Sequence, residues 1–172
     1  SALPVLFLHG FAGSWRSFEP VLRYLPDAIN ALALTQRGHG EASKPSKGYH
    51  LEDLAADAAA FMDALGLEQA VIVGHSMGSA VAQRLALDYP DRSAGLVLAG
   101  ACVVKPGGAQ VQAFWDSTVS KLTDPVDPDF ARGFLESTLA QPVPEKTFER
   151  ALTDSLKLPA RVWKAMWKAR LE

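Results

Sequence analysis

Residues 70–82 decide the fold and read AVIVGHSMGSAVA. The β-branched residues at the start indicate a buried strand, and the alanine-rich end indicates a helix. Between them, Gly74-His75-Ser76-Met77-Gly78 matches the Gly-x-Ser-x-Gly pattern of a strained turn that exposes a serine hydroxyl. The two glycines are expected because a side chain at either position would collide with neighbouring strand or helix backbone. Ser76 is therefore the candidate nucleophile, and its neighbours are the expected support of the turn.

A phosphate-binding loop is the other common glycine-rich turn between a strand and a helix. Such a loop would also contain Gly-Lys-Ser or Gly-Lys-Thr, which is absent around Ser76. The serine-presenting turn is therefore the favoured interpretation.

Short apolar runs alternate with helical patterns through the first hundred residues, which is typical of a parallel sheet covered by helices. The apolar runs are residues 5–8, 28–34, 70–73 and 95–99. Apolar side chains recur every three or four positions in residues 51–65, which predicts a helix. Gly66 is placed to end this helix by taking a left-handed conformation. The fold class is therefore α/β.

The pattern changes after Cys102, where strands give way to four helical segments. Proline-containing breaks separate them at residues 106–108, 124–125, 141–142 and 158–159. The first segment carries apolar residues on one face, namely Val111, Phe114, Trp115 and Leu122. The last segment also has an apolar face, formed by Val162, Trp163, Met166 and Trp167. Asp127-Pro128 is the expected start of the second segment. We therefore expect a sheet-containing core in residues 1–104 and a helical cap in residues 105–172.

Composition excludes several classes of protein. The 172 residues are 48% hydrophobic with a formal net charge of -2, which favours a globular chain without the basic excess of a nucleic-acid-binding protein. No apolar run approaches the roughly 20 residues that span a bilayer, so no membrane association is expected and the cytoplasm is the default location. No cluster of metal-binding residues or phosphate cradle is visible, so neither metal nor cofactor is expected.

Two further motifs follow the first two apolar runs. They are His9-Gly10-Phe11 and Arg37-Gly38-His39-Gly40. With Ser76, these motifs make the sequence resemble the α/β-hydrolase family, in particular its serine esterase, haloperoxidase-like and C–C hydrolase branch. The resemblance implies a partial α/β-hydrolase fold, with a mostly parallel sheet flanked by helices and a C-terminal helical cap. Serine at the nucleophile position argues against the haloalkane dehalogenase and epoxide hydrolase branches, which use an aspartate.

The resemblance also assigns roles. The backbone N–H groups of Phe11 and Met77 would form an oxyanion hole, and His9 would be structural. Three aromatic side chains of the cap, Trp115, Trp163 and Trp167, would roof an apolar substrate pocket. The acid that often precedes the family's arginine is replaced by Gln36, so the usual local ion pair of Arg37 is not expected.

A base and an acid for Ser76 are missing from the positions where the family has them. Family members supply them after the nucleophile, whereas all four histidines precede Ser76, namely His9, His39, His50 and His75. Residues 100–103 offer no carboxylate where some members place the acid. We interpret the aspartates of the cap as helix caps or solvated charges, namely Asp116, Asp124, Asp127, Asp129 and Asp154.

These observations predict a family member truncated before its last core strands. The expected function of the intact protein is hydrolysis of ester substrates with a small hydrophobic acyl group through an acyl-serine, with the 172-residue chain alone incomplete. The alternatives are a small-molecule receptor or signalling protein on the same scaffold, or an inactive fragment that folds and associates by itself. The strand at residues 95–99 would be an apolar edge, covered by a missing segment or by a second copy in a homodimer.

Overall fold

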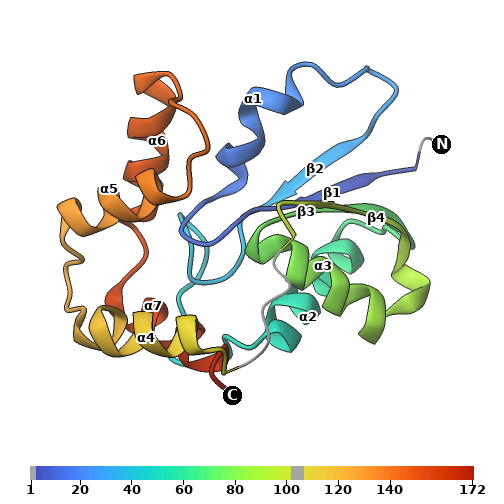
Figure 1. The fold of residues 1–172 in the computed structure, drawn as a ribbon. Helices are drawn as coiled ribbons and strands as arrows, with labels where there is room; N and C mark the ends of the chain where they lie inside the picture. Colours follow the sequence, from blue (N-terminus) through green and yellow to red (C-terminus); the bar gives the residue numbers. More distant parts are fainter. Residues whose placement is uncertain (1–2, 102–106) are drawn as a thin grey trace.

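The computed structural model describes residues 3–101 and 107–172. Its core is a parallel sheet in the order β2-β1-β3-β4 (Figure 1). The strands are β1 (Val5–Leu8), β2 (Ala31–Leu34), β3 (Ala70–His75) and β4 (Ser93–Ala99). All four expected strands are present, and the α/β fold class is confirmed.

Two strand boundaries differ from the expected ones. The strand β2 begins at Ala31 rather than at residue 28, because a turn precedes it in which the Ile29 N–H donates to the Pro26 carbonyl at 2.9 Å. The strand β4 begins two residues early, at Ser93, where its register with β3 is irregular. Apolar character alone could not locate either boundary.

Two helices, α2 (Leu51–Ala64) and α3 (Met77–Asp88), lie together against one face of the sheet (Figure 1). The buried face of α2 is rich in alanine, which brings the two helices close, and consists of Leu54, Ala55, Ala58, Ala59 and Met62. Gly66 follows α2 with φ of 65°, the left-handed conformation expected from the sequence.

Three short helices were not predicted by the apolar pattern. The 3₁₀ helix η1 (Trp15–Phe18) and α1 (Glu19–Leu22) connect β1 to β2, and η2 (Pro90–Arg92) leads into β4. A helix of three or four residues is too short to show a 3.6-residue period, so periodicity could not reveal these elements.

The remaining helices lie beyond the carboxyl ends of the strands (Figure 1), and we call them the cap helices. They are α4 (Ala109–Ser117), η3 (Val119–Lys121), α5 (Pro128–Ser137), α6 (Glu145–Ser155) and α7 (Ala160–Ala169). The four expected segments are present, although α4 ends at Ser117, so Leu122 lies outside it. The expected boundary between residues 104 and 105 lies outside the described residues.

Aromatic packing joins the cap to the core. The Trp163 side chain of α7 is fully buried, and its ring centroid lies 4.6 Å from that of Phe11 in the loop after β1. Phe130 and Phe134 of α5 pack against the same indole at 5.1 and 4.8 Å. The loop after β1 is therefore in contact with two cap helices.

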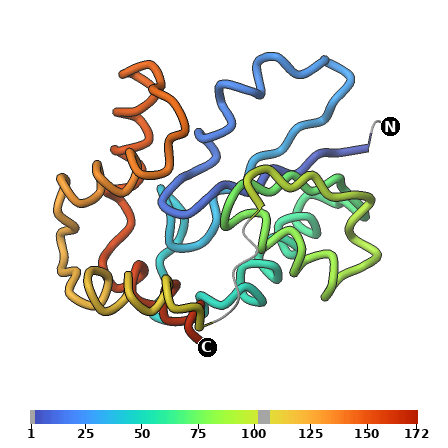
Figure 2. The backbone as a smooth tube through the Cα atoms, viewed as in Figure 1, coloured from blue at the N-terminus to red at the C-terminus, as the bar shows by residue number. Residues whose placement is uncertain are grey.

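The chain path brings the end of the chain back to the start of the cap. Figure 2 shows the C-terminus beside the first cap helix and the N-terminus on the opposite side of the molecule. The Gly107 N–H donates to the Arg170 carbonyl at 3.1 Å. Within residues 3–101 and 107–172, no helix has both the length and the apolar character needed to cross a bilayer.

Candidate active site

Ser76 occupies the turn between β3 and α3 in a strained conformation. Its φ and ψ are 50° and −117°, values that residues other than glycine rarely adopt. A Cβ on Gly74 would lie 2.3 Å from the Gly78 carbonyl oxygen, and a Cβ on Gly78 would lie 2.0 Å from the Leu8 carbonyl oxygen. The expected collisions with strand and helix backbone are therefore confirmed.

Hydrogen bonds hold the strained turn in place. The Ser76 N–H donates to the Ala99 carbonyl of β4 at 3.0 Å, and the Ser79 hydroxyl donates to the Ser76 carbonyl at 2.6 Å. The Ser76 side chain itself is partly exposed, and its hydroxyl makes no hydrogen bond to any residue that the structure describes. The turn thus fixes the backbone and leaves the hydroxyl available.

The loop after β1 passes directly beside Ser76. A Cβ on Gly10 would lie 3.2 Å from the Ser76 Cβ and 3.0 Å from the His75 Nδ1 atom. Only glycine fits this gap without displacing one of its neighbours. The segments that follow β1 and β3 therefore meet at the candidate nucleophile.

The backbone N–H groups of Phe11 and Met77, near Ser76, have no acceptor in the part of the chain that the structure describes. Met77 is the first residue of α3, so its N–H has no acceptor within the helix. Neither this N–H nor that of Phe11 donates a hydrogen bond to another described residue. Free donors at the positive end of a helix favour negative charge, as an oxyanion hole requires.

His9 is buried and holds the loop instead of facing Ser76. The Gln36 backbone N–H donates to its Nε2 atom at 3.0 Å, so Nδ1 carries the proton and donates to the Gly10 carbonyl at 2.8 Å. The Gln36 side chain donates to the His9 carbonyl at 2.8 Å. Burial lowers the pKa of His9 to about 4, so the ring is neutral near pH 7.

His39 is also buried and neutral. Its Nδ1 atom donates to the Arg37 carbonyl at 3.0 Å, and its Nε2 atom has no partner among the described residues. Burial, together with the nearby His9 ring 5.0 Å away, lowers its pKa to about 3. Its ring packs edge-on against Phe11 at 5.6 Å.

The other two histidines lie at the surface. The His75 ring is exposed, with Nδ1 beside Gly10 and Cδ2 beside Gly100. His50 precedes α2 and faces the Glu172 carboxylate at 3.6 Å. No histidine of residues 3–101 and 107–172 makes a hydrogen bond to the Ser76 hydroxyl.

Arg37 has an ion-pair partner that its neighbouring sequence did not indicate. Its guanidinium forms two hydrogen bonds with the Asp57 carboxylate on α2, one of them 2.5 Å long between Nη2 and Oδ1. A third hydrogen bond reaches the Gly48 carbonyl at 2.9 Å. Arg37 is therefore held by an ion pair with a residue 20 positions further along the chain.

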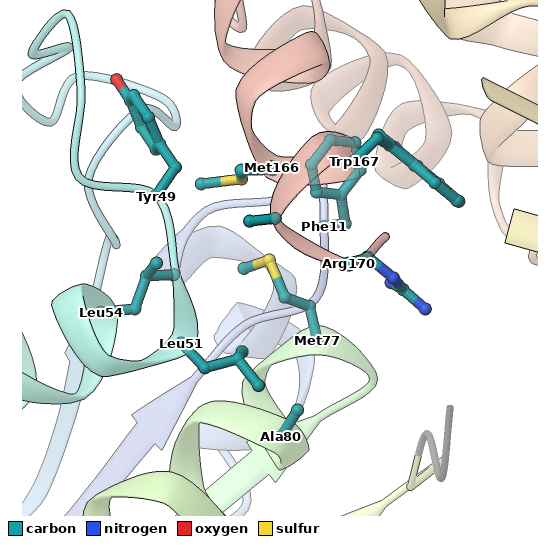
Figure 3. Close-up of a pocket in the computed structure, with 10 residues that line it drawn as sticks. Phe11, Tyr49, Leu51, Leu54, Met77, Ala80, Met166, Trp167 and Arg170 are labelled. Atoms are coloured by element: carbon teal, nitrogen blue, oxygen red, sulfur yellow. The ribbon is translucent and has the colours of Figure 1, made fainter. Parts of the chain in front are cut away.

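A mostly apolar cavity of about 130 Å³ opens between α2, α3 and α7 (Figure 3). The side chains of Phe11 and Met77 line it, opposite Met166 and Trp167 of α7. Figure 3 shows Met77 and Met166 approaching the same space from opposite sides, with Phe11 beside them. Ser76 itself is not among the lining residues.

The three tryptophans expected around a pocket lie in different places. Trp167 lines the cavity, and its ring packs 4.8 Å from that of Phe114. Trp163 is fully buried in the aromatic cluster around Phe11, and Trp115 is a partly buried residue packed on the core. Neither belongs to the lining of this cavity.

The interpretation of the cap aspartates as helix caps or solvated charges is wrong for Asp154. Asp127 caps α5, Asp124 accepts a hydrogen bond from the Ala160 N–H, and Asp116 and Asp129 are exposed. Asp154 instead has a side chain only 4% exposed and accepts a 2.5 Å hydrogen bond from the Ser14 hydroxyl. Its partner is 140 residues away, so no local sequence signal could have revealed the pair. Within the described residues, no group of three acidic, His or Cys side chains could hold a metal ion.

The sequence model for the alpha/beta hydrolase fold matches residues 4–171. The chain is 46% identical over 88 residues to the "Dihydrolipoyllysine-residue acetyltransferase component of acetoin cleaving system" of Cupriavidus necator, which covers 51% of this chain and 24% of the relative. It is 41% identical over 96 residues to epoxide hydrolase B of Mycobacterium tuberculosis, covering 54% of this chain and 27% of the relative. These matches span about a quarter of the length of the curated relatives.

A solved esterase from Exiguobacterium antarcticum has a similar structure, with a TM-score of 0.84 and 23% sequence identity. The similarity covers 100% of this chain and 67% of the esterase, and it concerns the fold. Three observations indicate the same fold, namely the parallel sheet, the strained serine turn and the sequence match across residues 4–171. The chain therefore belongs to the alpha/beta hydrolase fold family.

Proposed function

We propose that this chain carries the nucleophile and the oxyanion hole of a serine hydrolase that acts on esters with a small apolar acyl group. The observation that carries the proposal is the position of Ser76. Among the described residues its hydroxyl has no hydrogen-bond partner, its backbone is held in a strained turn, and the N–H groups of Phe11 and Met77 in adjoining segments have no acceptor. This combination is what acyl transfer to a serine requires.

In the proposed reaction, the Ser76 oxygen attacks the carbonyl carbon of the ester while a base removes the hydroxyl proton. The carbonyl oxygen becomes negatively charged and accepts hydrogen bonds from the Phe11 and Met77 N–H groups. Each such donor contributes about 3 to 4 kcal/mol to the stability of the transition state. The alcohol leaves with the proton, and water then releases the acid from the acyl-serine.

Ester substrates fit Ser76 better than the epoxides that the name of one relative indicates. An epoxide opened by a carboxylate gives an ester, which water can hydrolyse. An epoxide opened by a serine would give an ether, which water does not cleave under mild conditions. The alcohol nucleophile at position 76 therefore favours acyl substrates over epoxides.

The cavity beside the site favours a small acyl group. Its volume of about 130 Å³ is similar to the ~150 Å³ of an apolar cavity that holds one benzene molecule in another protein. Most of the lining is apolar, with flexible or aliphatic contacts from Met77, Met166 and Leu54, and Arg170 is the one charged residue among the described lining residues. We therefore expect acyl chains of a few carbons to be preferred over long ones.

The base and its acid are proposed to come from polypeptide outside residues 1–172. His9 and His39 are buried, neutral and hydrogen-bonded to backbone, and the surface residues His50 and His75 do not bond to the Ser76 hydroxyl. Without a base, the chain alone should hydrolyse esters about 10³-fold or more slowly than an intact triad enzyme.

The test uses p-nitrophenyl acetate, butyrate and octanoate with a full-length protein and its Ser76→Ala variant. The proposal predicts turnover that depends on Ser76 and declines from butyrate to octanoate. Ser137→Ala is the matched control, because Ser137 lies at the exposed end of α5 and its hydroxyl donates to the Phe134 carbonyl there. Absence of turnover in the full-length protein would leave a ligand-binding receptor on the same scaffold as the better interpretation.

A further inference from the structure

Asp154 links the cap to the segment that carries Phe11. It lies near the end of α6, and its Oδ2 atom accepts a hydrogen bond from the Ser14 hydroxyl at 2.5 Å. Ser14 lies three residues after Phe11 and is itself 2% exposed. The contact is therefore a buried bond between a cap helix and the loop that passes beside Ser76.

The loop is built so that Ser14 and Phe11 cannot move independently. The Gly13 N–H donates to the Gly10 carbonyl at 3.2 Å, and Ala12 is held at φ of 59° with its side chain 1% exposed. The Ser14 oxygen also accepts the Arg16 N–H at 3.1 Å, which caps η1. A displacement of Ser14 would therefore be transmitted to the Phe11 N–H.

Two cations keep the Asp154 carboxylate ionised. Lys157 Nζ lies 3.0 Å and Arg16 Nη1 lies 3.6 Å from its Oδ1 atom, and Lys157 also pairs with Glu41 at 2.7 Å. Burial by itself raises the pKa of Asp154, but the hydrogen bonds from Ser14 and Lys157 outweigh it, so this pKa lies below its usual value. The bond from Ser14 is therefore a charge-assisted one near neutral pH.

We propose that Asp154 is a positioning residue that anchors Ser14 to the cap helix α6. It thereby holds residues 9–14, which we call the oxyanion loop, against Ser76. The inference rests on the proposed function, because the Phe11 N–H matters for catalysis only if it binds an oxyanion. It makes assembly of the oxyanion hole dependent on docking of the cap. Misplacement of a catalytic donor by about 1 Å can reduce a rate by about 100-fold.

The kinetic test compares Asp154→Ala, Asp154→Asn and Ser14→Ala in the full-length protein with a p-nitrophenyl ester. Asp154→Ala should lower kcat by about 10- to 100-fold with KM changed less than about threefold, because the oxyanion forms only in the transition state. Asp154→Asn retains an acceptor for Ser14 and should recover part of the loss. The double variant Ser14→Ala/Asp154→Ala should be no slower than the slower single variant, since both remove one bond.

Arg150→Gln is the matched control. Arg150 lies on the same helix and also joins the cap to the core, through Glu19 of α1 at 3.0 Å, but it does not touch the oxyanion loop. Both side chains of that pair are about half exposed, so its loss should leave kcat within twofold of wild type. An equal loss of kcat in Arg150→Gln and Asp154→Ala would overturn the specific role of Asp154.

Hydrogen exchange tests the same inference without catalysis. Peptides that cover residues 9–18 should exchange faster in Asp154→Ala and Ser14→Ala than in wild type, while those covering α2 should not change. Unchanged exchange in residues 9–18 would overturn the inference even if the protein hydrolyses esters. Faster exchange in the two variants, together with a wild-type protein that shows no Ser76-dependent turnover, would refute the proposed function and leave the anchoring of the loop standing.

Discussion

At the scale of single residues, Gly78 connects the sequence pattern to the geometry of the site. The position sits where α3 begins, and its α-carbon faces the carbonyl of Leu8 at the end of β1. The nucleophile turn can approach the first strand this closely only without a side chain. The glycine therefore fixes the distance between Ser76 and the loop that carries Phe11.

Substitution of Gly78 tests this close approach. In Gly78→Ala the new Cβ would lie 2.0 Å from the Leu8 carbonyl oxygen. The Cβ is bonded directly to the backbone and the oxygen is a backbone atom, so neither can rotate away. We expect a loss of at least about 3 kcal/mol in the free energy of unfolding, measured by urea denaturation. Gly133→Ala in α5 is the control, since nothing lies within 4 Å of its Cβ, and it should stabilise by about 0.5 to 1 kcal/mol. Equal effects of the two substitutions would contradict the described turn.

The buried histidines predict a loss of stability in mild acid. The pKa values of His9 and His39 are lowered to about 4 and about 3, whereas unfolded histidine titrates near about 6.5. Below about pH 6.5 the unfolded chain therefore binds more protons than the folded chain, and the free energy of unfolding decreases as the pH is lowered. Each histidine should contribute roughly 2 kcal/mol of this loss between pH 7 and pH 5.

The measurement is urea denaturation at several pH values from 7 to 5. His39→Gln should show a weaker pH dependence than wild type, whatever its stability at pH 7. His50→Gln is the control because its side chain is half exposed, and it should keep the wild-type slope. A wild-type slope in His39→Gln would show that His39 is not buried as a neutral ring.

At the scale of elements, the sequence predicted which segments form strands and main helices but not their contacts or the order of the strands in the sheet. Alternating apolar runs and helical periods reveal an element through neighbours in the sequence. The partners of Arg37, Ser14 and Trp163 lie far away in the chain, at Asp57, Asp154 and Phe11. Such pairs arise only when the elements pack, so residue patterns cannot show them.

Trp163 is the largest of the buried side chains that join α7 to the rest of the molecule, beside polar contacts such as that of Arg161 with the Pro45 carbonyl. Its indole is fully buried between Phe11 and the two phenylalanines of α5. Trp163→Ala should therefore cost about 3 to 5 kcal/mol of unfolding free energy, because it leaves a large cavity. Trp15→Ala, at a site 39% exposed, should cost less than about 1 kcal/mol. Similar losses in thermal or urea denaturation would place Trp163 outside the core.

At the scale of the whole molecule, β4 is an edge strand of the sheet, paired on one side with β3. Leu96, Val97 and Leu98 are 39%, 51% and 38% exposed, which is unusual for consecutive apolar residues of a strand. We propose that a second copy of the chain or a further polypeptide segment covers this edge. An unpaired apolar edge readily pairs with another strand.

Sedimentation velocity tests the coverage of the β4 edge. The chain of residues 1–172 should self-associate at micromolar concentrations, and Val97→Lys should reduce the association because a charged edge residue opposes strand pairing. Leu139→Lys is the control, since Leu139 is 38% exposed, like Leu98, and lies between α5 and α6 rather than in the sheet. A wild-type chain that remains monomeric would contradict association through β4.

The sequence could predict half of the candidate site. Ser76 and the adjacent Met77 N–H follow from one local motif, whereas the approach of Gly10 and the anchoring of Ser14 depend on tertiary packing. The aromatic cap was expected as a pocket roof, but the fully buried Trp163 belongs to the core. Aromatic spacing alone does not distinguish these two uses of a helix face.

Covalent labelling tests whether Ser76 is an activatable nucleophile. A full-length protein should react with a fluorophosphonate in a 1:1 ratio, and peptide mass spectrometry should place the adduct on Ser76. Ser76→Ala should remain unlabelled, and Ser137→Ala, at the exposed end of α5, should be labelled like wild type. An unlabelled wild-type protein, or an adduct that persists in Ser76→Ala, would show that Ser76 is not the nucleophile.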